Sequence, residues 1–375
     1  MKLVIGKETL DAEKRVAASP ETVRKLIALG FDVGVARGAG LGAAVTDDMF
    51  QAAGAQILSG ENVYADADVV LRVRHPSNDD IAGMKRGAVL VSQLSPYQEK
   101  DVLHALATQG ITAFAMELVP RITRAQSMDV LSSQANLAGY RAVLEAAAVY
   151  GRAFPLMMTA AGTVPPAKVF VMGAGVAGLQ AIATARRLGA QVSATDVRPA
   201  AKEQVESLGA SFVMVENEET KAAETAGGYA KEMSDDYKRQ QAALIAETIK
   251  KQDIVITTAL IPGRAAPVLV TEEMVRSMKP GSVIVDLAVE QGGNCALSKA
   301  GEIVEVNGVS IVGIPNLPSR IAVDASSLYA RNLYNFLAPM VDAESKTLKI
   351  NREDEIVKAS LVTADGQIVH PNFQS

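Results

Sequence analysis

The segment Gly173-Ala174-Gly175-Val176-Ala177-Gly178 constrains the fold of this chain more than any other stretch of its sequence. It directly follows the apolar run VFVM, which is typical of a buried strand, and it precedes a helical pattern. In that position Gly173 permits a tight turn, Gly175 lets the backbone approach a pyrophosphate, and Gly178 lets the helix pack closely on the strand. The segment therefore predicts a dinucleotide-binding βαβ unit, whose helix N-terminus presents free N–H groups to the phosphates. A purely structural glycine-rich turn is the alternative.

The residue that ends the next predicted strand indicates which dinucleotide is bound. Asp196 stands 18 residues after Gly178, where its carboxylate can accept hydrogen bonds from an adenosine ribose. A 2'-phosphate there would be repelled by about 4 kcal/mol if the charges lay about 4 Å apart at an effective dielectric of about 20. Both effects favour NAD(H) over NADP(H). Arg198 is an opposing feature, because an arginine can accommodate a phosphate, but we expect it to lie near the adenine with Val197.

Short apolar runs alternate with amphipathic stretches along most of the chain, which predicts an α/β fold with parallel sheets covered by helices on both faces. At 375 residues the chain is long enough for two domains. We expect both to be Rossmann-like, doubly wound parallel-sheet domains. The strands expected in the first are Leu3–Ile5, Asp32–Val35, Val69–Val73, Ala88–Ser92 and Thr112–Ala115. Those expected in the second are Lys168–Met172, Gln191–Thr195, Ser211–Val215, Ile254–Thr258, Ser282–Asp286 and Ser310–Gly313.

Two long helical patterns, Ser132–Met158 and Asp324–Pro339, are expected to join these domains. Because the chain would pass from one domain to the other and back, the first domain is predicted to be discontinuous. It would comprise residues 1–131 together with 324–375, and the second domain would comprise residues 132–323.

Local signals mark several element ends and one insertion. Ser19 before Pro20 is typical of a helix N-cap, and Gly30 would end that helix. The pair Asp365-Gly366 predicts the turn of a terminal hairpin. The connection over residues 217–240 is longer than a crossover requires. A loop of this length is usually functional or disordered, and a solvated insertion is the alternative.

Composition excludes several classes of protein. The 42 acidic residues outnumber the 37 basic ones, and the net charge of -5 argues against nucleic-acid binding and against a basic membrane-surface protein. The single cysteine, Cys295, and the three histidines argue against a disulfide framework and against a metal site. We expect no membrane span, no signal peptide and a cytoplasmic location.

A second polar cluster lies in the sequence RITRAQSMDVLS, where the first domain leads into the long helix. Gln126 can both donate to and accept from a carboxamide, and Asp129 can accept from the NH2 group of a carboxamide. Arg121 can bind a pyrophosphate or pair with the carboxylate of Asp129. Ligand sites often lie at domain junctions of this kind. The alternative is a helix N-cap with an Arg–Asp surface pair.

Ala259 and Leu260 follow the fourth predicted strand of the second domain. The carboxyl ends of parallel strands face the ligand crevice, so we expect Leu260 to touch the ribose or the nicotinamide. An ordinary core position for Leu260 is the alternative.

No residue stands out as a general base. His104 falls on an amphipathic stretch, His75 precedes a proline at a strand end, and His370 lies near the C-terminus. A dehydrogenase that acts on an alcohol or an amine moves a proton as well as a hydride, and it normally keeps such a group near the nicotinamide. Hydride exchange between two nicotinamides moves no proton, so it requires no such residue.

Five segments of the sequence are similar to those of one enzyme family. They are RVAASP from Arg15, MELVPRITRAQSMDVLSSQANLAGYRAV from Met116, MMTAAGTVPPAKVFVMGAGVAGLQAIATARRLGA from Met157, AETAGGYAKEM from Ala223 and VDLAVEQGGNC from Val285. Through them the chain resembles, over nearly its whole length, the NAD(H)-binding component of the proton-translocating nicotinamide nucleotide transhydrogenases, in the form whose alpha subunit is split. The resemblance implies direct, Si-specific/Re-type hydride transfer between NADH on this chain and NADP+ on a partner.

The resemblance also implies the partners. They are an NADP(H)-binding beta subunit and the membrane subunit that forms the remainder of the split alpha subunit, which together couple hydride transfer to proton translocation. A homodimer of this chain is implied as well. The chain would then be peripheral to the inner membrane through its partner subunits.

Site residues follow from the same resemblance. The residues implied to hold the nicotinamide are Arg121, Gln126, Asp129 and Ser132. Those implied to contact the rest of NAD(H) are Val176, Asp196, Val197, Arg198, Gln241 and Leu260. A loop that closes over the cofactor through Gly228 and Tyr229 is implied too. Of all these residues, we expect Arg121, Gln126, Asp129 and Tyr229 to act on hydride transfer.

Alanine dehydrogenase is the nearest related enzyme and gives the main alternative, a free-standing oxidoreductase of that type. The chain keeps Arg15 but departs from that pattern at three positions. Ser95 stands where the catalytic histidine is expected, Arg74 replaces a substrate-binding lysine, and Glu290 replaces an aspartate. These departures argue against amino-acid oxidation. A redox-sensing NAD-binding regulator without chemistry is a third hypothesis.

Overall fold

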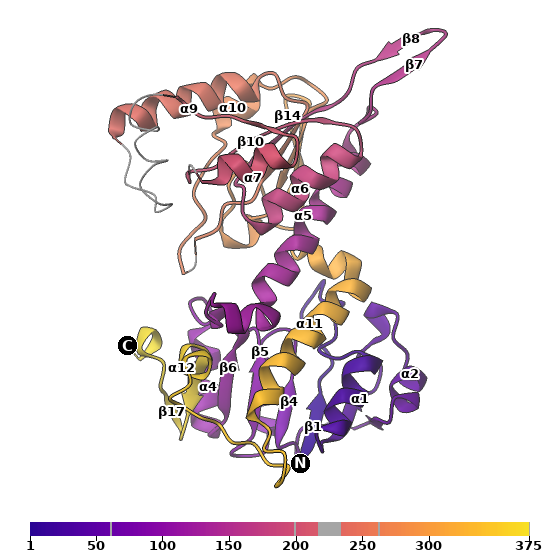
Figure 1. Cartoon of the computed structure of the whole chain (residues 1–375), viewed down its shortest axis with the longest axis vertical. Coiled ribbons are helices and arrows are strands. Elements are labelled where there is room, and N and C mark those ends of the chain that lie inside the picture. Colours follow the sequence, from indigo (N-terminus) through magenta and orange to yellow (C-terminus); the bar gives the residue numbers. More distant parts are fainter. Residues whose placement is uncertain (61, 199, 217–233, 262, 375) are drawn as a thin grey trace. The chain divides into compact units, whose positions relative to one another are not determined.

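The computed structural model describes residues 1–60, 62–198, 200–216, 234–261 and 263–374, and it divides the chain into two compact units (Figure 1). The first unit comprises Met1–Gln134 and Pro318–Ser375, and the second comprises Ala135–Leu317. Each contains a mainly parallel sheet with helices, so the predicted α/β fold class is confirmed.

Within the described residues, the sheet of the first unit has eight strands in the order β17-β16-β6-β5-β4-β1-β2-β3. Strands β1 to β6 pair in parallel, whereas β16 pairs antiparallel with β6 and β17. The order reverses at β1, which pairs with both β2 and β4, so a ligand crevice is expected beyond the carboxyl ends of β1 and β4. The strand bounds are β1 (Lys2–Ile5), β2 (Asp32–Ala36), β3 (Gln56–Leu58), β4 (Val69–Leu71), β5 (Val89–Ser92), β6 (Thr112–Ala115), β16 (Leu361–Ala364) and β17 (Gln367–Ile368).

The helices of the first unit connect these strands, and α11 contributes apolar side chains to the core on one face of the sheet. Its α-helices are α1 (Pro20–Ala28), α2 (Asp47–Ala52), α3 (Asn78–Gly83), α4 (Lys100–Gln109), α11 (Ala322–Leu337) and α12 (Glu355–Ser360). Its 3-10 helices are η1 (Leu41–Ala43), η2 (Met116–Leu118), η3 (Thr123–Met128), η6 (Ala338–Met340) and η7 (Pro371–Phe373). Two helices contain the boundaries between the units: α5 (Val130–Val149) and η5 (Leu317–Ile321).

The second unit contains a seven-stranded sheet, counted over its described residues, in the order β11-β10-β9-β12-β13-β15-β14. All neighbours are parallel except β14 and β15. The order reverses at β9, which pairs with β10 and β12. The strands are β9 (Lys168–Met172), β10 (Gln191–Thr195), β11 (Ser211–Phe212), β12 (Ile254–Thr257), β13 (Val283–Asp286), β14 (Ile303–Val306) and β15 (Val309–Val312). The helices are α6 (Val176–Arg187), α7 (Ala201–Ser207), α9 (Asp235–Ile249), α10 (Glu272–Ser277) and η4 (Val289–Gln291).

The central strands of each sheet are buried on both faces, as parallel sheets require. In β1, Leu3 and Ile5 belong to one apolar cluster and Val4 belongs to another. In β9, Val169 and Phe170 likewise belong to different clusters. This alternation explains why the strands read as continuous apolar runs in the sequence.

The long helix predicted for Ser132–Met158 is wrong at its C-terminal end. Helix α5 ends at Val149, and β7 (Met157–Thr159) pairs with β8 (Gly162–Val164) in a separate two-stranded hairpin. Gly151 and Pro155 account for the early end, because glycine is a poor helix former and proline lacks the N–H that an interior helix position needs.

Two short edge strands were not predicted from the sequence. β3 and β14 each lie at an edge of a sheet, where burial is incomplete and the apolar pattern is weak. The turn after β14 carried a readable signal, because Asn307 and Gly308 both have positive φ, 51° and 75°, as a tight hairpin turn requires. The predicted hairpin at Asp365-Gly366 is confirmed by the pairing of β16 with β17.

Helix α1 gives a direct test of the sequence-derived cap. The Ser19 hydroxyl accepts a hydrogen bond from the Thr22 N–H, and the Thr22 side chain accepts one from the Ser19 N–H. We predict that Ser19→Ala lowers the free energy of unfolding by about 1 kcal/mol, because it removes the hydroxyl that accepts from the Thr22 N–H at the start of the helix. Chemical denaturation measures the change. Ser277→Ala, which removes a hydroxyl from an exposed helix end, is the control and should have little effect; equal effects of the two changes would contradict the prediction.

Candidate functional site

The glycine-rich segment lies at the carboxyl end of β9, where the strand order of the second unit reverses. Gly173 has a φ of 104°, and a Cβ on it would lie 2.6 Å from the Thr258 hydroxyl oxygen. A Cβ on Gly178 would lie 1.8 Å from the Gly173 carbonyl oxygen, so α6 packs on β9 more closely than any side chain allows. Both glycines therefore have the structural roles that their spacing predicts.

Gly175 differs from these two glycines. A Cβ on Gly175 would meet no atom of the described residues within 4 Å, so no packing contact among them requires a glycine there. Gly175 is also the N-cap of α6, and no side chain in the described part of the chain caps this helix end by a hydrogen bond. Open space in front of free N–H groups suits a phosphate, which such a helix terminus attracts.

Asp196 lies at the end of β10 with 7% of its side chain exposed. Its Oδ2 accepts from the Ala174 N–H at 2.7 Å, and its two carboxylate oxygens accept from the Arg198 guanidinium at 2.9 and 3.0 Å. Burial alone would raise the pKa of Asp196, but the hydrogen bonds from Arg198 and Ala174 outweigh it and hold that pKa below its ordinary value. Asp196 is thus an ionised carboxylate fixed beside the glycine-rich turn.

Three of the expected cofactor contacts are apolar residues that solvent reaches. Val176, Val197 and Leu260 are exposed by 39%, 84% and 49%. They follow β9, β10 and β12, whose carboxyl ends lie at one edge of the sheet. The alternative that Leu260 is a core residue is therefore wrong, and the three side chains offer apolar surface for flat rings.

Two amides hold neighbouring segments of this edge in place. Asn294 accepts from the Ala259 N–H at 2.9 Å and donates to the carbonyl oxygens of Ala259 and Pro267. Gln241 of α9 donates to Thr195 and accepts from the Val215 N–H at 2.8 Å. Sequence reasoning missed Asn294, and Gln241 has a structural role in addition to the cofactor contact that we expected.

In the first unit, the segment from Arg121 to Ser132 contains η3 and the start of α5. Arg121 and Gln126 are exposed, whereas Asp129 and Ser132 are half-buried. Asp129 accepts from the Ser132 N–H at 2.8 Å and from the Ser132 hydroxyl at 2.6 Å, which makes it the cap of α5. The expected helix cap is therefore present together with an exposed amide and an exposed guanidinium.

Arg124, in the same segment, pairs with an aspartate that lies far away in the sequence. Arg124 donates to both carboxylate oxygens of Asp354, at 2.8 and 3.1 Å, which joins η3 to the N-cap of α12. The pair is exposed and so adds little stability, but it fixes one side of the segment that carries Gln126.

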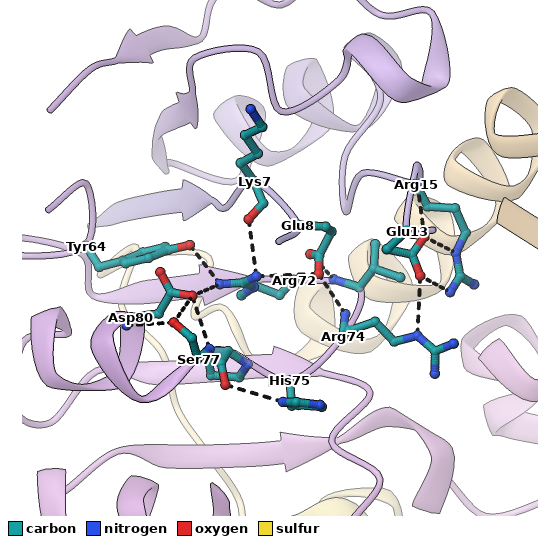
Figure 2. A network of polar contacts seen from close by, with 12 residues as sticks. Lys7, Glu8, Glu13, Arg15, Tyr64, Arg72, Arg74, His75, Ser77 and Asp80 are labelled. Atoms are coloured by element: carbon teal, nitrogen blue, oxygen red, sulfur yellow. Dashed lines mark hydrogen bonds and ion pairs between the residues drawn. The ribbon is translucent and has the colours of Figure 1, made fainter. Parts of the chain in front are cut away.

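A buried group of charges lies around the carboxyl ends of β1 and β4 (Figure 2). We refer to Glu8, Glu13, Arg15, Arg72 and Arg74 as the arginine–glutamate cluster. Arg15 donates to both oxygens of Glu13 at 2.8 and 2.6 Å, Arg74 donates to Glu13 at 3.3 Å, and Arg72 lies 3.5 Å from Glu8.

Burial alone would raise the pKa of Glu13, but hydrogen bonds from Arg15 outweigh it and lower that pKa to about 2. Burial raises the pKa of Glu8 in spite of Arg72. Glu13 is therefore ionised at neutral pH and forms a permanent pair with Arg15. Of these five residues, Arg15 and Arg74 were named from the sequence, and Glu8, Glu13 and Arg72 were missed. The charged residues that directly follow β1 and β4 were the sequence signal that could have indicated them.

The three histidines, all within the described residues, lie in three different places. His75 contacts the Pro76 carbonyl oxygen at 3.4 Å, His104 is exposed on α4, and His370 caps η7. At Ser95 the backbone N–H donates to Glu117 at 2.5 Å, and burial raises the pKa of that carboxyl. A serine hydroxyl at this position does not titrate near neutral pH, so it does not replace a histidine base.

Several expectations concern absences or lie outside the structure. Among the described residues, no group of three or more His, Cys, Asp or Glu side chains could hold a metal ion. No helix in the described ranges has the length and apolarity to cross a membrane. Gly228 and Tyr229, expected to close over the cofactor, lie outside the described residues.

Comparisons with known proteins match this chain along nearly its whole length. The family described as Alanine dehydrogenase/PNT, N-terminal domain, matches residues 4–138, and the corresponding C-terminal domain matches residues 142–371. The first segment of the split NAD(P) transhydrogenase subunit alpha of Rhodospirillum rubrum is 59% identical over 99% of this chain and 98% of that protein. Alanine dehydrogenase of Bacillus subtilis is 30% identical over 98% of this chain and 93% of that protein. The crystal structure of a transhydrogenase from Sinorhizobium meliloti superposes with a TM-score of 0.91 at 58% identity, covering 98% of this chain and 100% of that one.

The different surroundings of the glycines predict different effects of adding one methyl group. Gly178→Ala should lower the free energy of unfolding by about 1–3 kcal/mol, because the Cβ would overlap the Gly173 carbonyl. Gly175→Ala should change it by less than about 1 kcal/mol, because only the N-cap preference is altered. Denaturant titration of both variants in the absence of nucleotide measures the difference. Equal destabilisation by the two substitutions would contradict this assignment.

Proposed function

Because the chain belongs to the alanine dehydrogenase/PNT family, we propose that it is the NAD(H)-binding component of a proton-translocating transhydrogenase. The observation that carries the proposal is the ionised Asp196 held by the Ala174 N–H beside the open Gly175 position. A carboxylate there binds the two hydroxyls of an NAD ribose and repels the 2'-phosphate of NADP.

The residues of the second unit fit the cofactor. The free N–H groups at the start of α6 would hold the pyrophosphate, and Asp196 would accept from the ribose hydroxyls. Val176, Val197 and Leu260 would cover the rings, with Arg198 and Gln241 beside them. When bound, NADH supplies the hydride.

The first unit supplies groups suited to a carboxamide. We assign the nicotinamide contacts to Arg121, Gln126, Asp129 and Ser132, as the resemblance to the transhydrogenases implies, and the donors and acceptors of Gln126 and Asp129 suit a carboxamide. Gln126 is exposed and so is available to a ligand, and Asp129 keeps unused lone pairs beside its two bonds to Ser132. Tyr229 and Gly228 complete the proposed set.

Hydride transfer then requires a second nicotinamide on another protein. One dinucleotide fingerprint is present in this sequence, and its Asp196 disfavours the phosphorylated cofactor, so NADP(H) is assigned to a beta-subunit partner. Proton translocation is assigned to that partner and to the membrane subunit that completes the split alpha subunit. The chain would be cytoplasmic and peripheral to the inner membrane through those subunits.

We also propose that the chain forms a homodimer. The β7–β8 hairpin exposes Leu156, Met157 and Met158 by 57%, 42% and 82%. An isolated two-stranded hairpin is marginally stable in water, and burial of these side chains against a second copy would stabilise it. Sedimentation as a monomer at micromolar concentration would contradict this.

A free-standing alanine-dehydrogenase-like oxidoreductase is the second candidate, and the 30% identity with that enzyme favours it. Its chemistry needs a group that accepts the proton of the amine or alcohol. Ser95, Arg74 and Glu290 replace the residues expected for that chemistry, and the histidines are placed elsewhere. Alanine-dependent reduction of NAD+ by the purified chain would support this candidate.

The cofactor assignment predicts a difference between two dinucleotides. Asp196→Ala should weaken NADH binding by about 1.5–3 kcal/mol, roughly 10- to 150-fold, and should narrow the preference over NADPH because Arg198 is released from its pair. Isothermal titration with both cofactors measures this. Asp253→Ala, at the amino end of the same sheet, is the control and should leave both affinities unchanged. Equal affinities of the unmodified chain for NADH and NADPH would refute the assignment.

The assignment of NADH to this chain and of NADP(H) to a partner predicts how the purified chain behaves. Alone, it should bind NADH yet neither reduce NADP+ nor oxidise alanine, and adding a soluble NADP(H)-binding component should restore transfer. Gln126→Asn should slow the transfer step more than it weakens binding, because a shortened side chain misplaces the ring. Stopped-flow transfer from NADPH to an NAD analogue, with each component omitted in turn, checks both statements. Rapid transfer without the second component would overturn the proposal.

A further inference from the structure

Asn332 of α11 is 7% exposed and holds the segment that carries Gln126. Its Nδ2 donates to the Ser127 carbonyl oxygen at 2.8 Å, and its Oδ1 accepts from the Ser133 hydroxyl at 2.7 Å. Asn335, one helical turn on, also donates to the Ser127 carbonyl, at 3.1 Å, and is half-buried. One carbonyl oxygen next to Gln126 therefore accepts from two amides of the same helix.

The contact continues into the protein as a chain of hydrogen bonds. Gln134 donates to the Ser133 hydroxyl at 3.3 Å and to the Ala325 carbonyl oxygen at 3.1 Å. The Oε1 atom of Gln134 accepts from Arg15 at 2.8 Å, and Arg15 is held in turn by Glu13. The arginine–glutamate cluster is thus linked through Gln134 and Ser133 to Asn332, all within the first unit.

Apolar packing supports the same arrangement. Ala125 and Met128 of η3 belong to the buried cluster that includes Leu333 of α11. One side of η3 is therefore fixed by packing, and its exposed side is fixed at Ser127 by the two amides. Since both polar atoms of the Asn332 amide have partners, its orientation is determined by the network.

We propose that Asn332 is a positioning residue for hydride transfer, a role that rests on the proposed function of Gln126 and Asp129. It acts by holding the Ser127 carbonyl, which sets where the neighbouring Gln126 side chain leaves the backbone. The arginine–glutamate cluster anchors Asn332 through Gln134 and needs no ligand for this role. Direct transfer requires the reacting carbons to be about 3–3.5 Å apart, and a displacement of about 1 Å can cost roughly 100-fold in rate.

Two variants of Asn332 separate this role from simple packing. Asn332→Asp keeps the shape of the side chain but replaces the donor facing the Ser127 carbonyl with an acceptor, and Asn332→Ala removes both groups. We expect each to slow hydride transfer about 10- to 100-fold in the presence of the NADP(H)-binding component, with the Kd for NADH changed less than about threefold. Asn335→Ala should slow transfer less, because Asn332 still holds the carbonyl.

Asn62→Ala is the matched control. Asn62 also donates from a side-chain amide to a backbone carbonyl oxygen in the first unit, at Gly83, and accepts from the Tyr64 N–H. Neither of these two partners belongs to the hydrogen-bonded chain from Arg15 to Asn332. It should leave both the rate and the Kd unchanged.

Amide hydrogen exchange tests, without any turnover, whether Asn332 holds the Ser127 carbonyl in place. Exchange in residues 123–132 should become faster in Asn332→Asp, whereas exchange in α1 should stay as in the unmodified chain. If the unmodified chain transfers no hydride with the partner component, the proposed function fails. Hydrogen exchange then still tests whether Asn332 holds the Ser127 carbonyl. If Gln126→Asn slows transfer but Asn332→Asp does not, the positioning role is wrong and the proposed function stands. Unchanged exchange in Asn332→Asp would also overturn the positioning role. If Asn332→Asp loses its fold or exchanges faster throughout the unit, Ser133→Ala replaces it, because this change removes the hydroxyl that links Gln134 to Asn332. A wild-type transfer rate and wild-type exchange in Ser133→Ala would then contradict the positioning role.

Discussion

The close packing of α6 on β9 is the constraint on which the proposed cofactor site depends. A Cβ on Gly178 would overlap the Gly173 carbonyl, so glycine lets the helix begin directly at the carboxyl end of the strand. The same turn fixes its neighbours, because the Ala174 N–H donates to Asp196 and the Thr258 hydroxyl donates to the Gly173 carbonyl oxygen. The ends of β9, β10 and β12 are thereby aligned around one helix N-terminus, which is where a dinucleotide phosphate is stabilised.

The first unit uses the equivalent place in its own sheet differently. Beyond β1 and β4 lie buried charges that pair with one another, and removing one partner of such a pair leaves an uncompensated charge. The Arg72 Nε atom has no hydrogen-bond partner among the described residues, whereas Arg15 is bonded to both Glu13 and Gln134. Bonded buried networks of this kind favour one arrangement of the surrounding backbone. We propose that the network between Glu13, Arg15 and Asn332 positions the segment that carries Gln126, whereas the second unit provides the phosphate site.

Features determined by local sequence were predicted well. The glycine spacing, the positions of the central strands and the Ser19 cap were readable because each depends on residues close together in the chain. Two expected strands end early, at Leu71 and at Phe212. The hairpin of β7 and β8 and the edge strands β3 and β14 were missed, because strands that are exposed or only partly buried give no clear apolar period. The link from Asn332 to Ser127 joins residues 205 positions apart, so no local pattern could reveal it. The site assignments for Arg121, Gln126 and Asp129 remain predictions.

The central claim is that this chain donates a hydride directly to a second nicotinamide and uses no proton-transferring group of its own. The most direct test follows the isotope. NADH carrying deuterium on the transferred position of C4 is mixed with this chain and an NADP+-loaded partner component in ordinary water, and the product NADPH is analysed by mass spectrometry. Direct hydride transfer predicts that all of the deuterium is retained in NADPH. When the experiment is repeated in D2O with unlabelled NADH, it predicts no deuterium at C4 of the product. Incorporation of solvent deuterium at C4 would contradict it.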